Sequence, residues 1–114
     1  MDNVIKNISF RFSARIAKLC RFLRDTKKES VISKQLLRCG TSIGANIAES
    51  QHAQSRPDFA SKLNIALKEA AETDYWLRLL YETDYLTKEQ FSSIMADCDE
   101  LESLLVSIVK TMKN

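Results

Sequence analysis

Glycine and proline are almost absent from this chain of 114 residues, which contains two glycines and one proline. A multi-stranded sheet needs many tight turns, and such turns depend on glycine and proline to reverse the chain. With 45% hydrophobic and 28% charged residues beside so few turn formers, the composition indicates a helical bundle. The length suits one domain with a sizeable core.

Side chains for metal binding and catalysis are also scarce. His52 is the only histidine, and no CxxC motif joins the three widely spaced cysteines, which are Cys20, Cys39 and Cys98. This pattern supports neither a zinc site nor a disulfide framework. A single histidine also supplies no nucleophile–base–acid set. We therefore expect no catalytic residue, no metal and no cofactor, and we interpret the cysteines as small buried hydrophobic residues in a reducing cytoplasm.

Long hydrophobic runs are missing as well. No apolar run approaches the roughly 20 residues that a membrane-spanning helix needs. The segment from Met1 to Lys6 does not have the layout of a signal peptide. The sequence thus predicts a soluble cytoplasmic protein with no membrane contact.

Four long segments do carry a strong signal, because their hydrophobic residues recur at spacings of three and four. Helices are predicted over about residues 3–27, 31–52, 56–82 and 88–111. We expect Ser30, Ser55 and Thr87 to cap the starts of the last three. Short connectors between helices of similar length are typical of an antiparallel up-and-down four-helix bundle. The predicted fold is therefore all-α, with residues 1–114 forming a single domain.

Both glycines lie inside the second predicted helix. Gly40, Gly44 and Ala48 are four residues apart, so they form one line of small residues along that helix. Glycine inside a helix costs about 1 kcal/mol relative to alanine. The line therefore predicts a seam where another helix, of the bundle or of an oligomer, packs very closely.

Polar and aromatic residues accompany this line. Ser42, Asn46 and Glu49 lie on one flank of the second helix, and we interpret them as the groups that fix the register of the seam by hydrogen bonding. Trp76 in the third helix is predicted to anchor an interface, because aromatic residues are enriched there.

Glu69 and Glu72 in the third helix are a pair of carboxylates that suggests acid–base or di-metal chemistry. A di-metal carboxylate bundle needs a Glu-x-x-His motif on each of two helices, whereas the chain has a single histidine. We therefore expect both acids to pair with basic groups of a neighbouring helix or subunit.

Charge is distributed unevenly along the chain. Residues 1–28 hold eight basic side chains against two acids, a balance of +6, whereas residues 81–114 hold three against seven, a balance of −4. No acid occurs between Asp2 and Asp25, so the polar face of the first helix is basic. Two interpretations stay open. The face is solvated and countered by acids of another helix, or it contacts the phosphates of a nucleic acid.

The candidate nucleic-acid-binding residues all lie on the first helix. They are Lys6, Arg11, Arg15, Lys18, Arg21 and Arg24. Phe10 and Phe22 on the same helix are interpreted as packing residues, with stacking on bases as the alternative.

The second and third helices resemble a known family. The matching runs lie within residues 35–49 and 57–80, and the most specific is Ser42-Ile43-x-x-Asn46-Ile47-x-Glu49. They are similar to small four-helix-bundle proteins, also called S23-type ribosomal proteins, that are encoded in intervening sequences of bacterial 23S rRNA genes. The chain departs from many members at Ser50, where those have glycine, and at Lys68-Glu69, where those have Gly-Ser.

The resemblance implies a bundle that assembles into a ring-like homo-oligomer, with pentamers known in the family. Related proteins are accessory proteins of diversity-generating retroelements, which present a basic surface to nucleic acid and to a reverse transcriptase. We therefore expect a non-enzymatic homo-oligomer that binds RNA or DNA, RNA above all, through the basic face of the first helix. An interaction scaffold with a protein partner and no nucleic-acid binding is the alternative.

Overall fold

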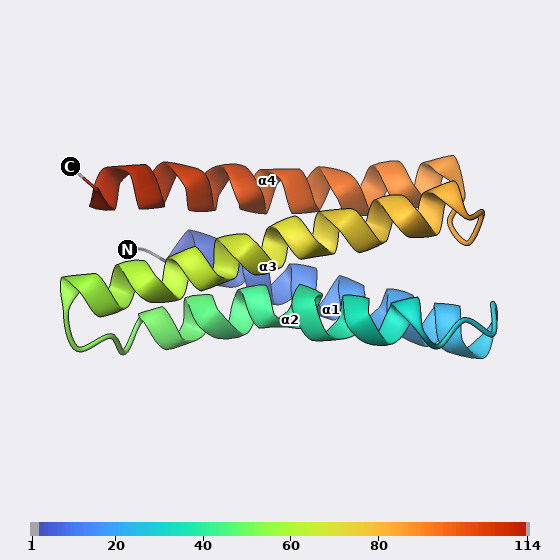
Figure 1. Ribbon diagram of the computed structural model, residues 1–114, viewed down its shortest axis with the longest axis horizontal. Helices are drawn as coiled ribbons and strands as arrows, with labels where there is room; N and C mark the ends of the chain where they lie inside the picture. Colours follow the sequence, from blue (N-terminus) through green and yellow to red (C-terminus); the bar gives the residue numbers. More distant parts are fainter. Residues whose placement is uncertain (1–2, 114) are drawn as a thin grey trace.

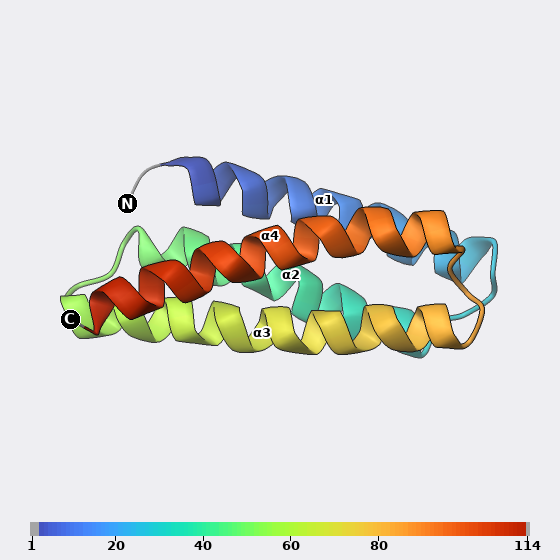
Figure 2. The same cartoon turned by 90° about the horizontal axis from the view of Figure 1, so that it is seen from above.

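A computed structural model describes residues 3–113, which form four α-helices and no strand. The helices are α1 (Asn3–Asp25), α2 (Ile32–Ser50), α3 (Arg56–Glu82) and α4 (Lys88–Met112). They form an elongated bundle of 44 × 20 × 20 Å (Figure 1). Successive helices run in opposite directions, so α1 begins and α4 ends at the same end of the bundle (Figures 1 and 2). The predicted antiparallel up-and-down four-helix bundle is confirmed.

The starts of α3 and α4 are capped as the local sequence predicts. The Ser55 hydroxyl accepts a hydrogen bond from the Asp58 amide at 3.1 Å, and Pro57 occupies the first turn of α3. At α4 the Thr87 hydroxyl accepts from the Gln90 amide at 3.1 Å, and the Gln90 side chain accepts from the Thr87 amide at 2.9 Å. These bonds satisfy amides that have no partner inside the helix.

The start of α2 differs from the prediction, because Ser30 is not its cap. The buried carboxylate of Glu29 accepts hydrogen bonds from the amides of Val31, Ile32 and Ser33 at 3.0, 2.8 and 2.8 Å. An ionised carboxylate is a stronger acceptor than a hydroxyl and also complements the positive end of the helix dipole. Glu29 thus satisfies the open amides that Ser30 was expected to satisfy.

Both α1 and α2 end two residues earlier than predicted. After Asp25 the Glu29 amide bonds to the Leu23 carbonyl at 2.9 Å, and Lys28 adopts a φ of 60°. This left-handed residue ends α1 in the usual manner of helix C-termini. Beyond Ser50 the amides bond to carbonyls three rather than four residues back, which tightens the chain out of the helix.

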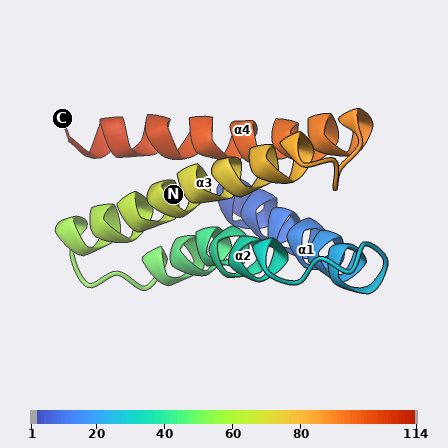
Figure 3. The same ribbon diagram turned by 45° about the vertical axis from the view of Figure 1, so that its right-hand side comes forward.

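Hydrophobic side chains from all four helices fill one core. Its largest fully buried members are Phe12, Ile16, Leu23, Leu36, Ile43, Ile47, Leu63, Leu77, Leu80, Leu101 and Leu105. The helices pack in the order α1, α2, α3, α4, and the contact between α1 and α4 is the smallest because α1 crosses α4 obliquely (Figures 2 and 3). Among residues 3–113, each helix is too short or too polar to cross a bilayer.

Candidate nucleic-acid interface

The apolar stripe of α1 faces the core and leaves a basic face outside. Ile5, Phe12 and Ile16 on this stripe are at most 2% exposed. Successive residues advance by about 100° around a helix, so residues one or two positions from the stripe turn toward solvent. All six candidate cations are exposed: Lys6, Arg11, Arg15, Lys18, Arg21 and Arg24.

Two of the six cations are paired with acids of the same chain. The Arg15 guanidinium donates to the Asp97 carboxylate at 2.5 Å and to the Ser93 hydroxyl at 3.0 Å, both on α4. Arg24 donates to its neighbour Asp25 at 2.7 Å. Both pairs are exposed to solvent, and exposed ion pairs add little to stability. The acidic α4 therefore counters a part of the basic charge of α1, as the first of the two interpretations expects.

The other four cations have no acidic partner within residues 3–113. Lys6, Arg11, Lys18 and Arg21 form no ion pair with any carboxylate of residues 3–113. Cations without an acidic partner in this part of the chain are what the second interpretation expects.

The glycines of α2 lie against α1. A methyl group built on Gly40 would sit 2.8 Å from Cγ2 of Ile16, and one built on Gly44 would sit 2.9 Å from the Ser13 hydroxyl and 3.2 Å from the Ser9 carbonyl oxygen. Carbon atoms in contact normally lie about 3.5–4.0 Å apart, and both contacts below 3.0 Å are closer than real methyl groups come to any heavy atom. A side chain at either point would therefore force α1 or its side chains to shift, and the seam lies between α1 and α2 of one protomer.

Two hollows lie along the outer side of this seam, and together they are called the groove between α1 and α2. The first, of about 640 Å³, lies toward the start of α1, where Lys6, Phe10 and Arg11 face Gly44 and Ala48 of α2. Among the described residues, no aspartate or glutamate lines it.

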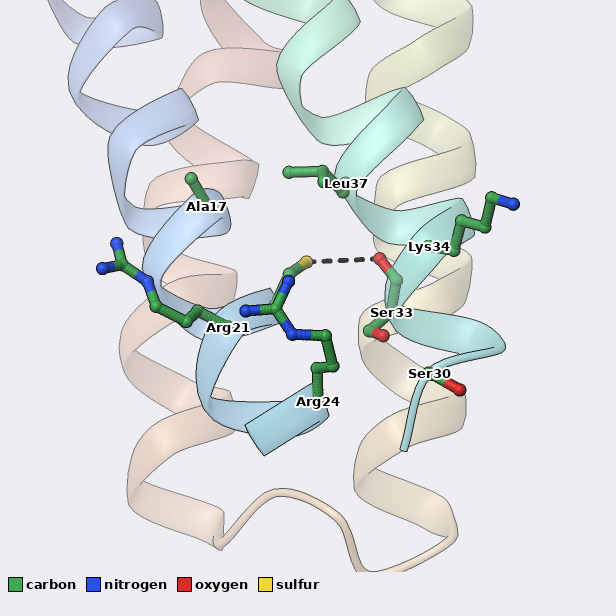
Figure 4. Close-up of a pocket in the computed structure, with 8 residues that line it drawn as sticks. Ala17, Arg21, Arg24, Ser30, Ser33, Lys34 and Leu37 are labelled. Atoms are coloured by element: carbon green, nitrogen blue, oxygen red, sulfur yellow. Dashed lines mark hydrogen bonds between the residues drawn. The ribbon is translucent and has the colours of Figure 1, made fainter. Parts of the chain in front are cut away.

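The second hollow, of about 400 Å³, lies toward the other end of α1, and its described lining residues also include no acid. Figure 4 shows Arg21 and Lys34 extending outward on its two sides, with Leu37 reaching from α2 toward Ala17 of α1. Both hollows of the groove between α1 and α2 are thus lined by apolar and small polar residues together with cations.

On the opposite side of α2, a polar network joins it to α3. The Arg38 guanidinium donates to Glu69 at 3.2 Å and also to Glu72, so the predicted pairing of these acids is confirmed. Glu72 accepts a further bond from the Trp76 ring nitrogen at 2.9 Å. The hydrogen bonds from Arg38 and Trp76 hold the pKa of Glu72 below its usual range. Trp76 also makes an edge-on contact with the exposed ring of Tyr75, at 5.0 Å between centroids.

The polar flank of α2 differs from the expected register lock. The Asn46 amide donates to the carbonyl and hydroxyl of Ser42 at 2.9 and 3.0 Å, so its bonds stay inside α2. Glu49 does reach another helix, because it accepts a hydrogen bond from Lys62 of α3 at 3.0 Å. Within the protomer, Ser42 and Asn46 therefore do not fix one helix against another, since i, i+4 bonds act within a helix.

An acidic cluster between α3 and α4 was not foreseen. Asp74, Asp99 and Glu102 place one carboxylate oxygen each within 4.8 Å of one another, and Arg78 donates to Asp74 at 2.5 Å. Burial and the two neighbouring carboxylates raise the pKa of Glu102. The sequence shows the acids of each helix, but only the packing of α3 on α4 brings them together.

All three cysteines are buried free thiols, as expected. Burial raises the pKa of Cys20 and of Cys98 to about 12. Both thiols stay protonated at neutral pH, and a protonated thiol is a weak nucleophile.

Residues 1–107 match the family described as 23S rRNA-intervening sequence protein. The chain is also similar to the crystal structure of a protein of unknown function from the S23 ribosomal protein family of Bacteroides thetaiotaomicron VPI-5482. The two chains are 58% identical, with a TM-score of 0.93 over 94% of this chain and 99% of the other. None of the curated proteins matches the chain.

Proposed function

The chain belongs to the family of 23S rRNA-intervening sequence proteins, and from this premise we propose that it is a non-enzymatic, self-associating bundle that binds RNA through α1. The protein acts in the cytoplasm, where its buried thiols stay reduced, and it needs no metal or cofactor. Its partners are further copies of itself and a nucleic acid.

The observation that carries RNA binding is the set of unpaired cations on α1. Lys6, Arg11, Lys18 and Arg21 are exposed and have no acidic partner among residues 3–113. A face of this kind attracts phosphates, and each neutralised phosphate releases condensed counterions. Arg24 joins this set when a phosphate competes with Asp25 for its guanidinium, whereas Arg15 is held by α4. The face is therefore centred on the four unpaired side chains.

Salt dependence of the affinity tests this function. For single-stranded RNA, four phosphate contacts lower log K by about 2.8 per tenfold rise in salt, which is about 50-fold in affinity between 50 and 200 mM. The double variant Lys18→Glu/Arg21→Glu reduces this slope by about 1.4. The matched control Lys68→Glu/Lys110→Glu changes the net charge equally on α3 and α4 and leaves most of the slope in place. Absence of binding even at low salt contradicts the function.

We place self-association on α3. This helix exposes Ile65, Tyr75 and Tyr81 beside the half-buried Trp76, and exposed aromatic residues are enriched in interfaces. Following the family resemblance, the assembly is a ring of five subunits. Light scattering then gives a multiple of the 13.0 kDa protomer mass. Ile65→Ser/Tyr75→Ser lowers this mass, and a wild-type mass of one protomer rejects self-association.

The ion pair between Arg15 and Asp97 favours a second candidate, a protein-binding scaffold without nucleic acid. The basic α1 then pairs with acids of another copy or of a protein partner. Charge reversal of Arg11, Arg15 and Lys18 separates the two functions. A lower molar mass with unchanged RNA retention selects the scaffold, whereas loss of RNA retention at unchanged mass selects nucleic-acid binding.

A further inference from the structure

Phe10 is the most exposed aromatic side chain of α1. It is 75% exposed, whereas Phe12 is 2% exposed and Phe22 packs against the core. The interpretation of Phe10 as a packing residue is therefore wrong within the protomer. Residues two positions apart on a helix lie about 200° apart, which places Phe10 on the side opposite to Phe12.

The surroundings of Phe10 are those of a ligand site. Phe10 lines the hollow of about 640 Å³ in the groove between α1 and α2, a size within the range of about 300–1,000 Å³ that ligand pockets have. Gly44 and Ala45 leave the floor smooth, because neither carries a side chain beyond Cβ. The Ser13 and Thr41 hydroxyls in the lining can donate or accept hydrogen bonds.

The charges around the hollow are all of one sign. Lys6 and Arg11, on either side of Phe10 in the sequence, belong to its lining, and no aspartate or glutamate of residues 3–113 does. Neither cation has an acidic partner among residues 3–113. The occupant that complements an exposed aromatic ring between two cations is anionic and carries a flat ring of its own.

Resting on the proposed RNA binding, we propose that this hollow holds an unpaired base of single-stranded RNA, stacked on Phe10, with the flanking phosphates at Lys6 and Arg11. In a duplex the bases are stacked on each other, so an aromatic side chain reaches their faces only in single strands, loops and bulges. Stacking on an aromatic ring combined with a cationic track is the usual mode of single-strand binding.

The rest of the groove fits the same ligand. Lys6 and Arg21 are about 22 Å apart along α1 at about 1.5 Å per residue. Arg21 and Lys34 stand on both sides of the second hollow (Figure 4). A single strand seated at Phe10 therefore continues along the groove toward cations at the other end of α1.

Fluorescence anisotropy with a labelled oligouridylate of about 12 nucleotides, a length within known single-strand site sizes, tests this site. Phe10→Ala is expected to weaken single-strand binding by about 5- to 150-fold, the range measured for loss of one stacked base. Phe10→Tyr keeps the ring and restores binding. Val31→Ala is the matched control, because Val31 is also 75% exposed and does not line either hollow.

The outcomes separate this site from the general function. Wild-type binding that Phe10→Ala leaves unchanged rejects the stacked base but keeps RNA binding through α1. A preference for duplex RNA over the single strand also rejects the stacked base. A changed molar mass of Phe10→Ala in light scattering, with unchanged RNA affinity, assigns the hollow to a second copy of the chain. Absence of any RNA binding by the wild type overturns both proposals.

Discussion

Gly40→Ala tests the close contact between α1 and α2. The added methyl group would lie 2.8 Å from Cγ2 and 3.1 Å from Cγ1 of Ile16, which is completely buried. Carbon atoms normally pack at about 3.5–4.0 Å. Ile16 is branched at Cβ, so its rotamer in a helix is nearly fixed and rotation does not relieve the contact. The substitution therefore forces the two helices apart.

Two opposing contributions set the size of the effect. Replacing glycine by alanine inside a helix favours folding by about 1 kcal/mol. Overpacking a filled core disfavours it by about 1–3 kcal/mol. Because both γ carbons of Ile16 are too close, we take an overpacking cost of about 2 kcal/mol, the middle of its range. The propensity gain of about 1 kcal/mol offsets half of this cost. The free energy of unfolding is therefore expected to fall by about 1 kcal/mol.

Urea unfolding at one fixed protein concentration measures this change. Ala45→Gly, on the exposed side of the same helix, measures the effect of helix propensity without a packing contact. It is expected to lower the free energy of unfolding by about 1 kcal/mol. Ile16→Leu removes Cγ2, so in that background Gly40→Ala is expected to be less harmful. A stability gain of about 1 kcal/mol from Gly40→Ala in the wild-type background refutes the close contact.

Three further predictions concern the seam, the cap of α2 and the acidic cluster. Gly44→Leu is expected to lower the free energy of unfolding by more than about 1 kcal/mol in urea, because its side chain meets the backbone of α1. Glu29→Ala leaves three amides at the start of α2 without their acceptor and is expected to lower the free energy of unfolding by about 1–2 kcal/mol, seen as a lower melting temperature. Glu102→Gln is expected to be more stable than the wild type at pH 7, because the folded state disfavours ionised Glu102 beside Asp74 and Asp99. That advantage disappears below about pH 4, where the carboxyl is protonated in folded and unfolded chains alike; an advantage that persists there contradicts this cause.

The bundle follows from the sequence because its signals are local. The spacing of hydrophobic residues fixes the four helices, and the caps at Ser55 and Thr87 need only residues three positions away. The cap of α2 was harder to predict from the sequence, since Ser30 and Glu29 can both accept hydrogen bonds from the first amides of the helix. In the structure Glu29, which directly follows the left-handed Lys28, is the one that turns toward the open amides.

The candidate site depends more on contacts between helices. The sequence places Arg15 and Lys18 alike on the basic face, but only the position of α4 separates the paired residue from the unpaired one. The outward position of Phe10 could be predicted from the sequence, because its angle from Phe12 around the helix turns it away from the core. The groove beside Phe10 could not be predicted from the sequence, since its shape depends on how closely α1 approaches Gly44.

The salt dependence of RNA affinity tests the proposed function most directly. The wild type and Lys18→Glu/Arg21→Glu are titrated with the same single-stranded RNA at salt concentrations between about 50 and 200 mM. RNA binding through the unpaired cations of α1 predicts a slope of log K against log salt near −2.8 for the wild type and about half of that for the variant. Equal slopes for the two proteins, or a wild type that binds no RNA at the lowest salt, contradict it.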